Sequence, residues 1–450
     1  MIEQADPAGA PGLAMRRIVA CWWPLAMSWL MMGAEMPMVA AVIGRLPSEE
    51  PNLAALAAIV YPVSILIEAP IIMLLAASTA LVKDWSSYCK LRRFTHTAAA
   101  VLTAIHVVTA FTPLYGWLAR EVIHAAEPVV EPGRIGLQIM TPWTWAIAMR
   151  RFQQGVLIRN ERSRVVVAGT LVRLLTVAGI LGVGLLSPVR SHFEAPLYGI
   201  VLGSLAIACG VLTEAVFIAV QTRPVLRDRV RRAAPAAEAW SWRGFGQFYV
   251  PLAMAPVLSI ALQPAGAAAM NRMREPLAST ACWSSVYGLI FLLRSAGFAF
   301  NEVVVALLGE PGAARALWRA ASRAALAAVG LLLLIAVTPL GRWWFANVMD
   351  LSAELTAVAA RAVGIGVLWP GYAMLQSYYQ GTLVYARRTR AVTEAVVLYV
   401  VVSGVLLLVG VHLVPLRGID YVLCAFAVAG IAQTLWLWQR SQSILRQLRA

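Results

Sequence analysis

Twelve apolar segments, each long enough to cross a lipid bilayer as one helix, follow one another along the chain of 450 residues. About 20 apolar residues span the roughly 30 Å hydrocarbon core of a membrane. Hydrophobic residues make up 60% of the chain and charged residues 13%, as in polytopic membrane proteins. The segments cover 17–44, 53–82, 95–118, 136–158, 164–187, 197–221, 244–270, 277–308, 316–341, 355–385, 391–413 and 418–439. The sequence therefore predicts an all-α polytopic membrane protein with twelve transmembrane helices.

The first apolar segment follows Arg16-Arg17 and is too long for the core of a signal peptide, so we expect it to remain in the protein. Five cysteines, at 21, 89, 209, 282 and 424, lack the paired spacing of a metal site or a disulfide framework. The sequence also contains no nucleophile, metal-ligand or ATP-binding motif. These observations predict a protein that is not an enzyme, binds no metal or cofactor, and draws on an ion gradient.

The basic residues are distributed unevenly between alternate loops, and this distribution predicts the orientation in the membrane. With the N-terminus in the cytoplasm, the loops on that side carry 24 basic residues and the opposite loops carry eight. Both termini are therefore predicted to be cytoplasmic. Orientation and contact with anionic lipid headgroups then explain the net charge of +15 without nucleic-acid binding. Of the 37 basic residues only Lys83 and Lys90 are lysines, a bias that favours a GC-rich bacterium and its inner membrane.

The second half of the sequence repeats landmarks of the first half in one register. FQQGVLIRNERSR at 152–164 returns as YYQGTLVYARRTR at 378–390, and WPLAM at 23–27 returns as VPLAM at 250–254. Further pairs, at offsets of 226 or 227, are Pro37 with Pro264, Arg45 with Arg272, Tyr61 with Tyr287, and Pro188 and Arg190 with Pro415 and Arg417. We interpret the chain as two six-helix copies, an N-lobe (1–222) and a C-lobe (244–450), joined by a basic cytoplasmic linker (223–243).

Six crossings return the chain to its starting side, so the two copies have the same orientation and are related by an axis along the membrane normal. Parallel repeats of this kind occur in secondary transporters, whose substrate site lies between the halves near the midplane. The segment VKDWSSYCKLRR at 82–93 lacks the glycines of the corresponding major facilitator loop. The proline-leucine opening of each half, the proline-bent first span, and Q-G-x-L before a basic stretch resemble instead the multidrug/oligosaccharidyl-lipid/polysaccharide (MOP) exporter superfamily.

Within that superfamily, the sequence is most similar to the progressive ankylosis (ANKH-type) family. The matching stretches are WWPLAM at 22–27, GAEMPMVAAVIGRL at 33–46, LAALAAIVYP at 53–62, LVKD at 81–84 and YVPLAM at 249–254. The resemblance implies a MATE-like fold of two lobes, alternating access, and a monomer that exports anions such as citrate, pyrophosphate or nucleotide. It also implies coupling to H+ or Na+. Related branches export cationic drugs or flip lipid-linked sugars.

Three ionisable residues lie where a membrane span should be apolar, and such residues usually face a cavity or a partner. Glu35 lies two residues before the helix-bending Pro37, which corresponds to Pro264 in the second copy, and Glu68 lies near the middle of the second span. Arg294 is the repeat counterpart of Glu68. In the superfamily, spans one, two, seven and eight line a central cleft, which implies that Glu35, Glu68 and Arg294 lie on its walls.

Our hypothesis is that Arg294 attracts the substrate, or pairs with Glu68 in one state, while Glu35 or Glu68 couples transport to protons. The alternative is a permanent bridge between Glu68 and Arg294 that only fastens the lobes together. Arg150 and Arg151 could form a basic vestibule for an anion, or their long side chains could reach the lipid headgroups. For the remaining intramembrane charges we expect satisfied helix pairs more than a transport role; these are Arg173, Arg361, Glu214, Glu302 and Glu394.

Three functions from different classes remain open at this stage. An anion exporter predicts arginines exposed in the central cavity. A cation or drug antiporter predicts an acidic, aromatic cavity in which Arg294 is neutralised. A flippase for lipid-linked saccharides predicts a lateral opening to the bilayer and a basic, hydrated lumen. The sequence leaves the substrate, the coupling ion and the resting conformation undetermined.

Overall fold

The computed structural model describes residues 14–160, 162–186, 196–234, 241–386 and 388–449. The α-helices of the first half are α1 (Met15–Ile43), α2 (Glu49–Ala55), α3 (Tyr61–Glu68), α4 (Leu74–Leu81), α5 (Trp85–Phe111), α6 (Leu114–Trp117), α7 (Glu127–Ile139), α8 (Thr141–Arg159), α9 (Ser163–Leu185) and α11 (Tyr198–Val225). Those of the second half are α12 (Trp242–Asn271), α13 (Pro276–Phe298), α14 (Phe300–Leu307), α15 (Ala313–Val337), α16 (Pro339–Trp343), α17 (Ala353–Ile365), α18 (Trp369–Tyr385), α19 (Thr389–Leu413) and α20 (Gly418–Arg449). Short π or 3-10 turns join some of them: η2 (Leu56–Val60), η3 (Ala69–Ile71), η4 (Leu118–Val122), η5 (Leu226–Val230) and η6 (Trp344–Val348).

The predicted membrane segments coincide with these helices, and the all-α polytopic class is confirmed. Within the described residues, ten helices or joined helices are long and apolar enough to cross a membrane. The predicted fourth and seventh segments are helical as well, as α8 and α12, but are not among these ten. In α8 the reason is the polar residues Arg150, Arg151, Gln153 and Gln154, some of which also belong to the candidate site.

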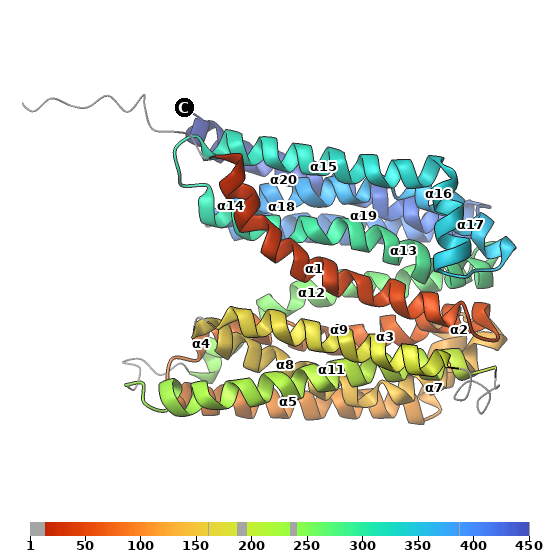
Figure 1. Ribbon diagram of the computed structural model, residues 1–450, viewed down its shortest axis with the longest axis horizontal. Helices are drawn as coiled ribbons and strands as arrows, with labels where there is room; N and C mark the ends of the chain where they lie inside the picture. Colours follow the sequence, from red (N-terminus) through yellow and green to blue (C-terminus); the bar gives the residue numbers. More distant parts are fainter. Residues whose placement is uncertain (1–13, 161, 187–195, 235–240, 387, 450) are drawn as a thin grey trace, which may run out of the picture.

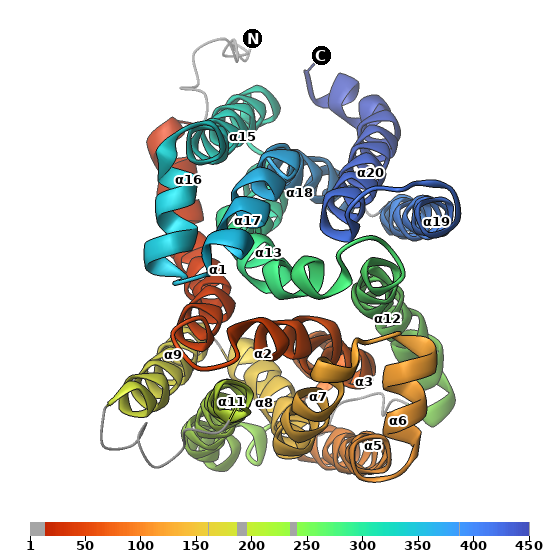
Figure 2. The same ribbon diagram turned by 90° about the vertical axis from the view of Figure 1, so that its right-hand side faces the viewer.

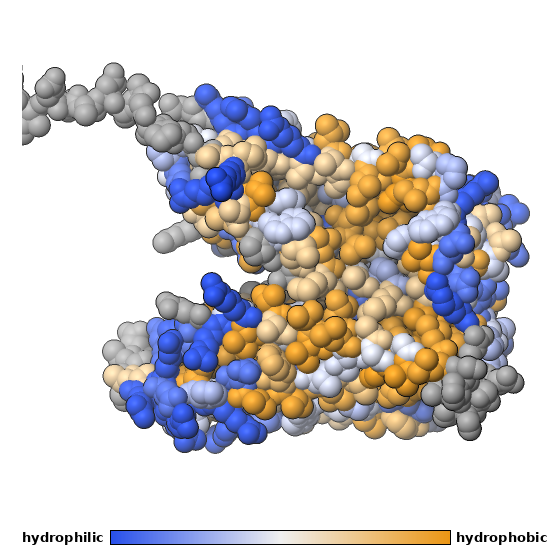
Figure 3. Space-filling view, viewed as in Figure 1, coloured by the Kyte–Doolittle hydropathy of each residue, from blue (hydrophilic) through white to orange (hydrophobic). Residues whose placement is uncertain are grey.

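The helices form two groups that meet at one end of the molecule and separate at the other. Figure 1 shows α3–α11 in the lower group and α13–α20 in the upper group, with α1 and α12 between them. The space-filling view shows the resulting cleft as a deep notch whose rim carries hydrophilic residues (Figure 3). The cleft opens at the end that holds α4, α14 and the C-terminus, whereas α2, α7, α16 and α17 lie at the closed end (Figure 1).

The first helix of each half packs against the other half as well as its own. Trp22 of α1 donates from Nε1 to the carbonyl oxygen of Ala296 at 2.9 Å. At equivalent positions of the repeat, the Tyr249 hydroxyl of α12 donates to the carbonyl oxygen of Pro70 at 2.7 Å. Helices α1 and α12 therefore each hydrogen-bond to the opposite half of the chain. The lobe boundaries at 222 and 244 stay a prediction. The predicted linker begins inside a helix, because α11 continues through η5 to Val230.

The internal repeat is confirmed at the level of single residues. Helices α7 and α17 begin and end 226 residues apart, as do the π turns η4 and η6. Each π turn is followed by a residue with positive φ, His124 at 56° and Asp350 at 52°. The repeat partners Pro188 and Arg190 lie outside the described residues, as does Arg387. Two copies of one structural unit therefore share one register through most of their length.

The repeated Gln-Gly pair has a packing role in both halves. A side chain on Gly155 of α8 would collide with Ser78 and with the carbonyl oxygen of Leu75 in α4. A Cβ on Gly381 of α18 would lie 2.7 Å from Val304 Cβ and 2.9 Å from the Asn301 carbonyl oxygen in α14. Ser78 and Val304 are themselves 226 residues apart. The glycine is repeated because it lets the same two helices approach closely in each copy.

We expect Gly155→Ala and Gly381→Ala each to destabilise the protein by about 1 to 3 kcal/mol, because the added methyl group overpacks a close helix contact. The measurement is unfolding by denaturant in detergent micelles. Gly179→Ala in α9 is the matched control, since a Cβ there meets no atom within 4 Å. An equal loss in the control would contradict this explanation.

Candidate functional site

Two adjoining pockets lie inside the molecule, one lined by both halves and the other by helices of the second half alone. The N-half pocket has an empty volume of about 1160 Å3. Its charged lining residues are Glu35 of α1, Glu68 of α3, Arg150 and Arg151 of α8, and Arg173 of α9. The C-half pocket has an empty volume of about 1100 Å3 and is lined by residues of α12, α13, α18, α19 and α20, including Arg294. Both pockets are lined by Gln263, Trp283 and Tyr287, so they adjoin at these side chains, and we refer to the two pockets together as the central cavity.

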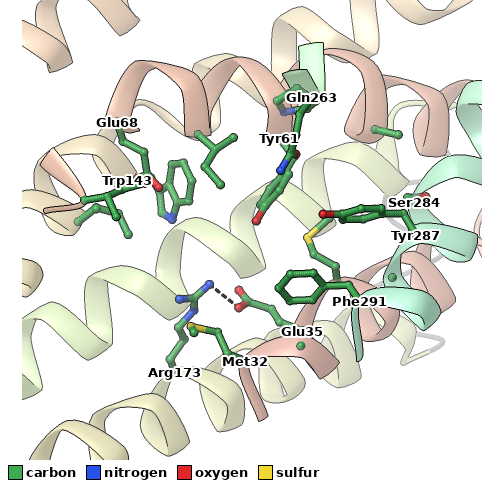
Figure 4. A pocket seen from close by; sticks show the side chains of 18 of the residues that line it. Met32, Glu35, Tyr61, Glu68, Trp143, Arg173, Gln263, Ser284, Tyr287 and Phe291 are labelled. Atoms are coloured by element: carbon green, nitrogen blue, oxygen red, sulfur yellow. Dashed lines mark ion pairs between the residues drawn. The ribbon is translucent and has the colours of Figure 1, made fainter. Parts of the chain in front are cut away.

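The N-half pocket is held together by buried ion pairs. Glu35 pairs with Arg173, as the dashed line in Figure 4 marks. Behind this pair, Arg150 Nη1 lies 2.5 Å from Glu214 Oε2 of α11. Arg173 Nη1 lies 3.9 Å from the same oxygen, and Gln154 Nε2 donates to Glu214 Oε1 at 3.1 Å. These contacts join α1, α8, α9 and α11. Three of the five charged residues that line the pocket, Glu35, Arg150 and Arg173, are therefore neutralised by ion pairs.

Glu68 and Arg151 line the same pocket without joining these ion pairs. Glu68 is 4% exposed, and its Oε2 atom has no hydrogen-bond partner in the described part of the chain. Arg151 likewise has a buried Nε atom that bonds to none of the described residues. Among the described residues, neither side chain has an opposite charge within 4 Å. Figure 4 shows Glu68 and Trp143 at one end of the pocket and Glu35 with Arg173 at another.

The C-half pocket contains a guanidinium group held by aromatic rings. The Arg294 Cζ atom lies 5.2 Å from the ring centre of Phe298 and 5.6 Å from that of Trp369. No carboxylate of the described ranges lies within 4 Å of it. The polar side chains around it are mainly neutral: Gln263, Tyr372, Gln376, Gln380, Tyr399 and Gln433. Arg294 is therefore the one charged residue lining this pocket in the described part of the chain.

The structure brings the predicted site residues to one cavity but not into the predicted contacts. Glu68 and Arg294 line different pockets, so the proposed bridge between them is not formed in this conformation. Arg150 does not extend to the lipid headgroups, because it is 3% exposed and paired with Glu214. Pro37 lies against Gly288 of α13, and α1 continues through it as α12 continues through Pro264.

Sequence reasoning underestimated Arg173, which lines the cavity, and Glu214, which lies behind Arg150. It predicted helix pairs for Arg173 and Glu214, and both residues are paired. Their partners, however, are the candidate site residues Glu35 and Arg150, which sequence spacing alone does not reveal. The available signal was an ionisable residue in each of two otherwise apolar spans.

The cavity contains more basic than acidic groups. Four arginines and two glutamates line it, and Glu214 adds a third carboxylate behind Arg150. Over the ranges that the structure describes, no three His, Cys, Asp or Glu side chains gather as metal ligands would. Guanidinium and amide groups of this kind are suited to bind carboxylate or phosphate oxygens.

Two repeated helical units with a pocket at their interface identify the fold. The chain has the fold of the MOP exporter superfamily, whose solved members it matches over almost their whole length. It is similar to an inward-facing MATE-family multidrug resistance transporter, with a TM-score of 0.64 and 15% identity over 93% of this chain and 98% of that one. It is similar to the lipid II flippase MurJ in an inward closed conformation, with a TM-score of 0.66 and 11% identity over 96% of this chain and 90% of that one.

A third similar structure is a MOP superfamily transporter from Pyrococcus furiosus, described as having a binding pocket of reverse polarity that suggests a different function. Its TM-score is 0.58 and its identity 13%, over 97% of this chain and 99% of that one. A scan against protein-family models and a search of curated proteins each give no match. The matched structures named here are two transporters and a flippase rather than enzymes, and at these identities they establish the fold.

Proposed function

We propose that the protein is a secondary transporter that moves a small organic or phosphate-bearing anion by alternating access of its two halves. The observation that supports this most strongly is Arg294, a guanidinium in the cavity without a carboxylate partner in the described residues. A charge inside a membrane protein is costly unless it faces water, a partner or a substrate. An anionic substrate provides the missing opposite charge.

The surroundings of Arg294 fit this role. The faces of Phe298 and Trp369 hold the guanidinium by cation-π contact without neutralising it. The guanidinium then remains available for two parallel hydrogen bonds to a carboxylate or phosphate. Gln380 and Gln433 add amide groups that can bind further oxygens of the substrate. The resemblance to the ANKH-type family, whose members export anions, agrees with this chemistry.

The side on which the cleft opens supports an assignment of the conformation. The notch in Figure 3 opens at the end of the molecule that holds the C-terminus and the N-terminal parts of α5 and α15. These parts carry several basic residues: Lys90, Arg92 and Arg93 in α5, and Arg315, Arg319 and Arg323 in α15. Basic loops of membrane proteins stay in the cytoplasm. We therefore assign this conformation as inward-facing. In the exporter that the family resemblance implies, this is the state that loads substrate from the cytoplasm of a bacterial cell before export across the inner membrane.

Glu68 is the better candidate for coupling transport to an ion. It is buried in the N-half pocket and, within the described residues, in no ion pair, so it can bind H+ or Na+ without first breaking a bridge. Glu35, by contrast, is paired with Arg173. Glu68 and the anion site at Arg294 belong to one cavity through the shared residue Tyr287, which allows occupancy at one end to affect the other.

We expect Glu68→Gln to uncouple transport, with loss of gradient-driven accumulation by about tenfold or more and retention of substrate exchange. The amide keeps the shape of the side chain but no longer binds and releases an ion. The measurement is uptake into proteoliposomes with and without an imposed H+ or Na+ gradient. Glu354→Gln, an exposed carboxylate of α17, is the control. Full gradient-driven accumulation in Glu68→Gln would show that coupling lies elsewhere.

A lipid flippase is the second candidate, because of one specific feature. An apolar groove between α15, α18 and α20, with an empty volume of about 940 Å3, is lined by Trp318, Leu326 and Leu435 among others. Tyr372 lines both this groove and the C-half pocket, so the groove adjoins the pocket that contains Arg294. A lipid-linked anion would place its head at Arg294 and its chain in the groove.

Counterflow in proteoliposomes tests these candidates together. Purified protein is loaded with unlabelled compound and offered radiolabelled citrate, pyrophosphate, a cationic dye, or a lipid-linked saccharide in the vesicle membrane. Saturable uptake of citrate or pyrophosphate supports the anion transporter. Uptake of the dye alone would contradict it and favour a cation antiporter, and movement of the lipid alone would favour the flippase.

A further inference from the structure

Two arginines cross between the halves at the closed end of the molecule. Arg45 follows α1 and donates from Nη1 to the Val348 carbonyl oxygen at 2.8 Å and from Nη2 to the Asn347 carbonyl oxygen at 2.9 Å. Arg272 follows α12 and donates from Nη2 to the Val122 carbonyl oxygen at 2.8 Å. Figure 2, which views this end, shows α16 beside α1 and α6 beside α12.

These contacts are the same contact made twice. Arg45 and Arg272 are repeat partners at an offset of 227, and Val122 and Val348 are repeat partners at an offset of 226. Each arginine of one half therefore grips the equivalent backbone of the other half. A symmetric interface repeats the same contact in both directions, as these arginine hydrogen bonds do. The packing within either half alone does not explain them.

The accepting carbonyls suit a cation. Val122 ends the π turn η4 and Val348 ends the π turn η6. The last carbonyl groups of a helical segment lack intrahelical partners and carry partial negative charge. Guanidinium groups satisfy them, and hydrogen bonds to a charged donor are stronger than neutral ones.

The neighbouring residues extend the same interface. Asn271 Nδ2 donates to the Ile123 carbonyl oxygen at 2.9 Å. At the equivalent place in the other copy, Gly44 lies directly against the Met349 carbonyl oxygen, with no room for a side chain. A further contact between halves, from Ser352 N to Glu49 Oε1 at 3.0 Å, lies at this end too.

We propose that Arg45 and Arg272 form a double latch that keeps the closed end shut while the cleft is open at the other end, and that both release when the halves rock. This rests on alternating access in the proposed function, but not on the nature of the substrate. Each arginine hydrogen-bonds across the boundary that must part, so opening this end breaks both sets of bonds. Removing the latch is expected to raise the population open at this end by about tenfold or more.

The test is a distance measurement between two spin labels by pulsed electron resonance. In a variant without the native cysteines, labels are placed at Glu131→Cys of α7 and Ala357→Cys of α17, which are exposed, repeat-equivalent positions. The parent protein is expected to give one short distance. The double variant Arg45→Gln/Arg272→Gln is expected to add a longer distance, with each single variant giving an intermediate population.

Arg120→Gln is the matched control, because Arg120 lies in η4 but pairs with Glu127 of its own half. It is expected to keep the parent distances. Identical distance distributions in the control and the double variant would overturn the latch. If the double variant does not fold, the single variants decide, since an unchanged distribution in both would overturn the proposal equally. The readout needs no substrate, so its failure is distinct from failure of the anion assignment.

Discussion

Replacing Arg294 with alanine is expected to reduce anion counterflow by about 10- to 100-fold, mainly through a higher KM for the anion. The physical reason is the loss of charge-assisted hydrogen bonds to the substrate, each of which contributes about 1.5 to 3 kcal/mol. Arg294→Lys is expected to retain part of the activity, because it keeps the charge but loses the planar fork that binds two oxygens together. The measurement is initial rate against anion concentration in proteoliposomes.

Arg361→Ala is the matched control for this variant. Arg361 is an exposed arginine of α17 in the same half, and it does not line the cavity. Its Nη2 atom lies 2.5 Å from Asp420 Oδ2. It is expected to transport at the parental rate. Unaltered anion transport by Arg294→Ala would remove the main support for the anion site. Loss of transport with an unchanged KM would point to a role in conformational change instead.

The second large effect is expected on stability, from Glu214→Ala. Glu214 is fully buried and is the ionic partner of Arg150, which is itself 3% exposed. Removing one member of a buried pair leaves an uncompensated charge and costs about 3 to 5 kcal/mol. We expect a matching loss in the free energy of unfolding, measured with denaturant in detergent micelles, and a lower yield of folded protein.

Two variants separate this explanation from a general effect of mutation. Glu310→Ala breaks an exposed ion pair with Arg17 and is expected to cost less than about 1 kcal/mol. The double variant Arg150→Met/Glu214→Leu removes both charges and is expected to recover most of the lost stability, because well-packed apolar residues can replace a buried ion pair. A double variant no more stable than Glu214→Ala would contradict the ionic explanation.

Among the candidate site residues, the intramembrane charges on the helices that line the cleft were predictable. Glu35, Glu68 and Arg294 stand out because each interrupts an apolar span, and all three line the central cavity. Their pairing was not predictable. Repeat symmetry suggested that Glu68 could pair with Arg294, but these two residues line different pockets.

For the latch residues, too, the sequence predicted the equivalence of two positions but not their contacts. The sequence identified Arg45 and Arg272 as repeat partners but gave them no role. The contact partners of Arg45 lie about 300 residues away in the sequence, and only the folded halves bring them together. Contacts between distant backbone atoms leave no mark on hydropathy or on local spacing.

By itself, the sequence determined the class, the twelve apolar segments and the two-copy repeat, because a bilayer imposes segment length and hydropathy and because duplication preserves register. The tertiary structure alone decided which charges meet, which end of the molecule is closed, and that Arg294 has no carboxylate partner in the described part of the chain. Side-chain pairing depends on the rotation and depth of each helix, and these are set by packing between helices that lie far apart in the chain.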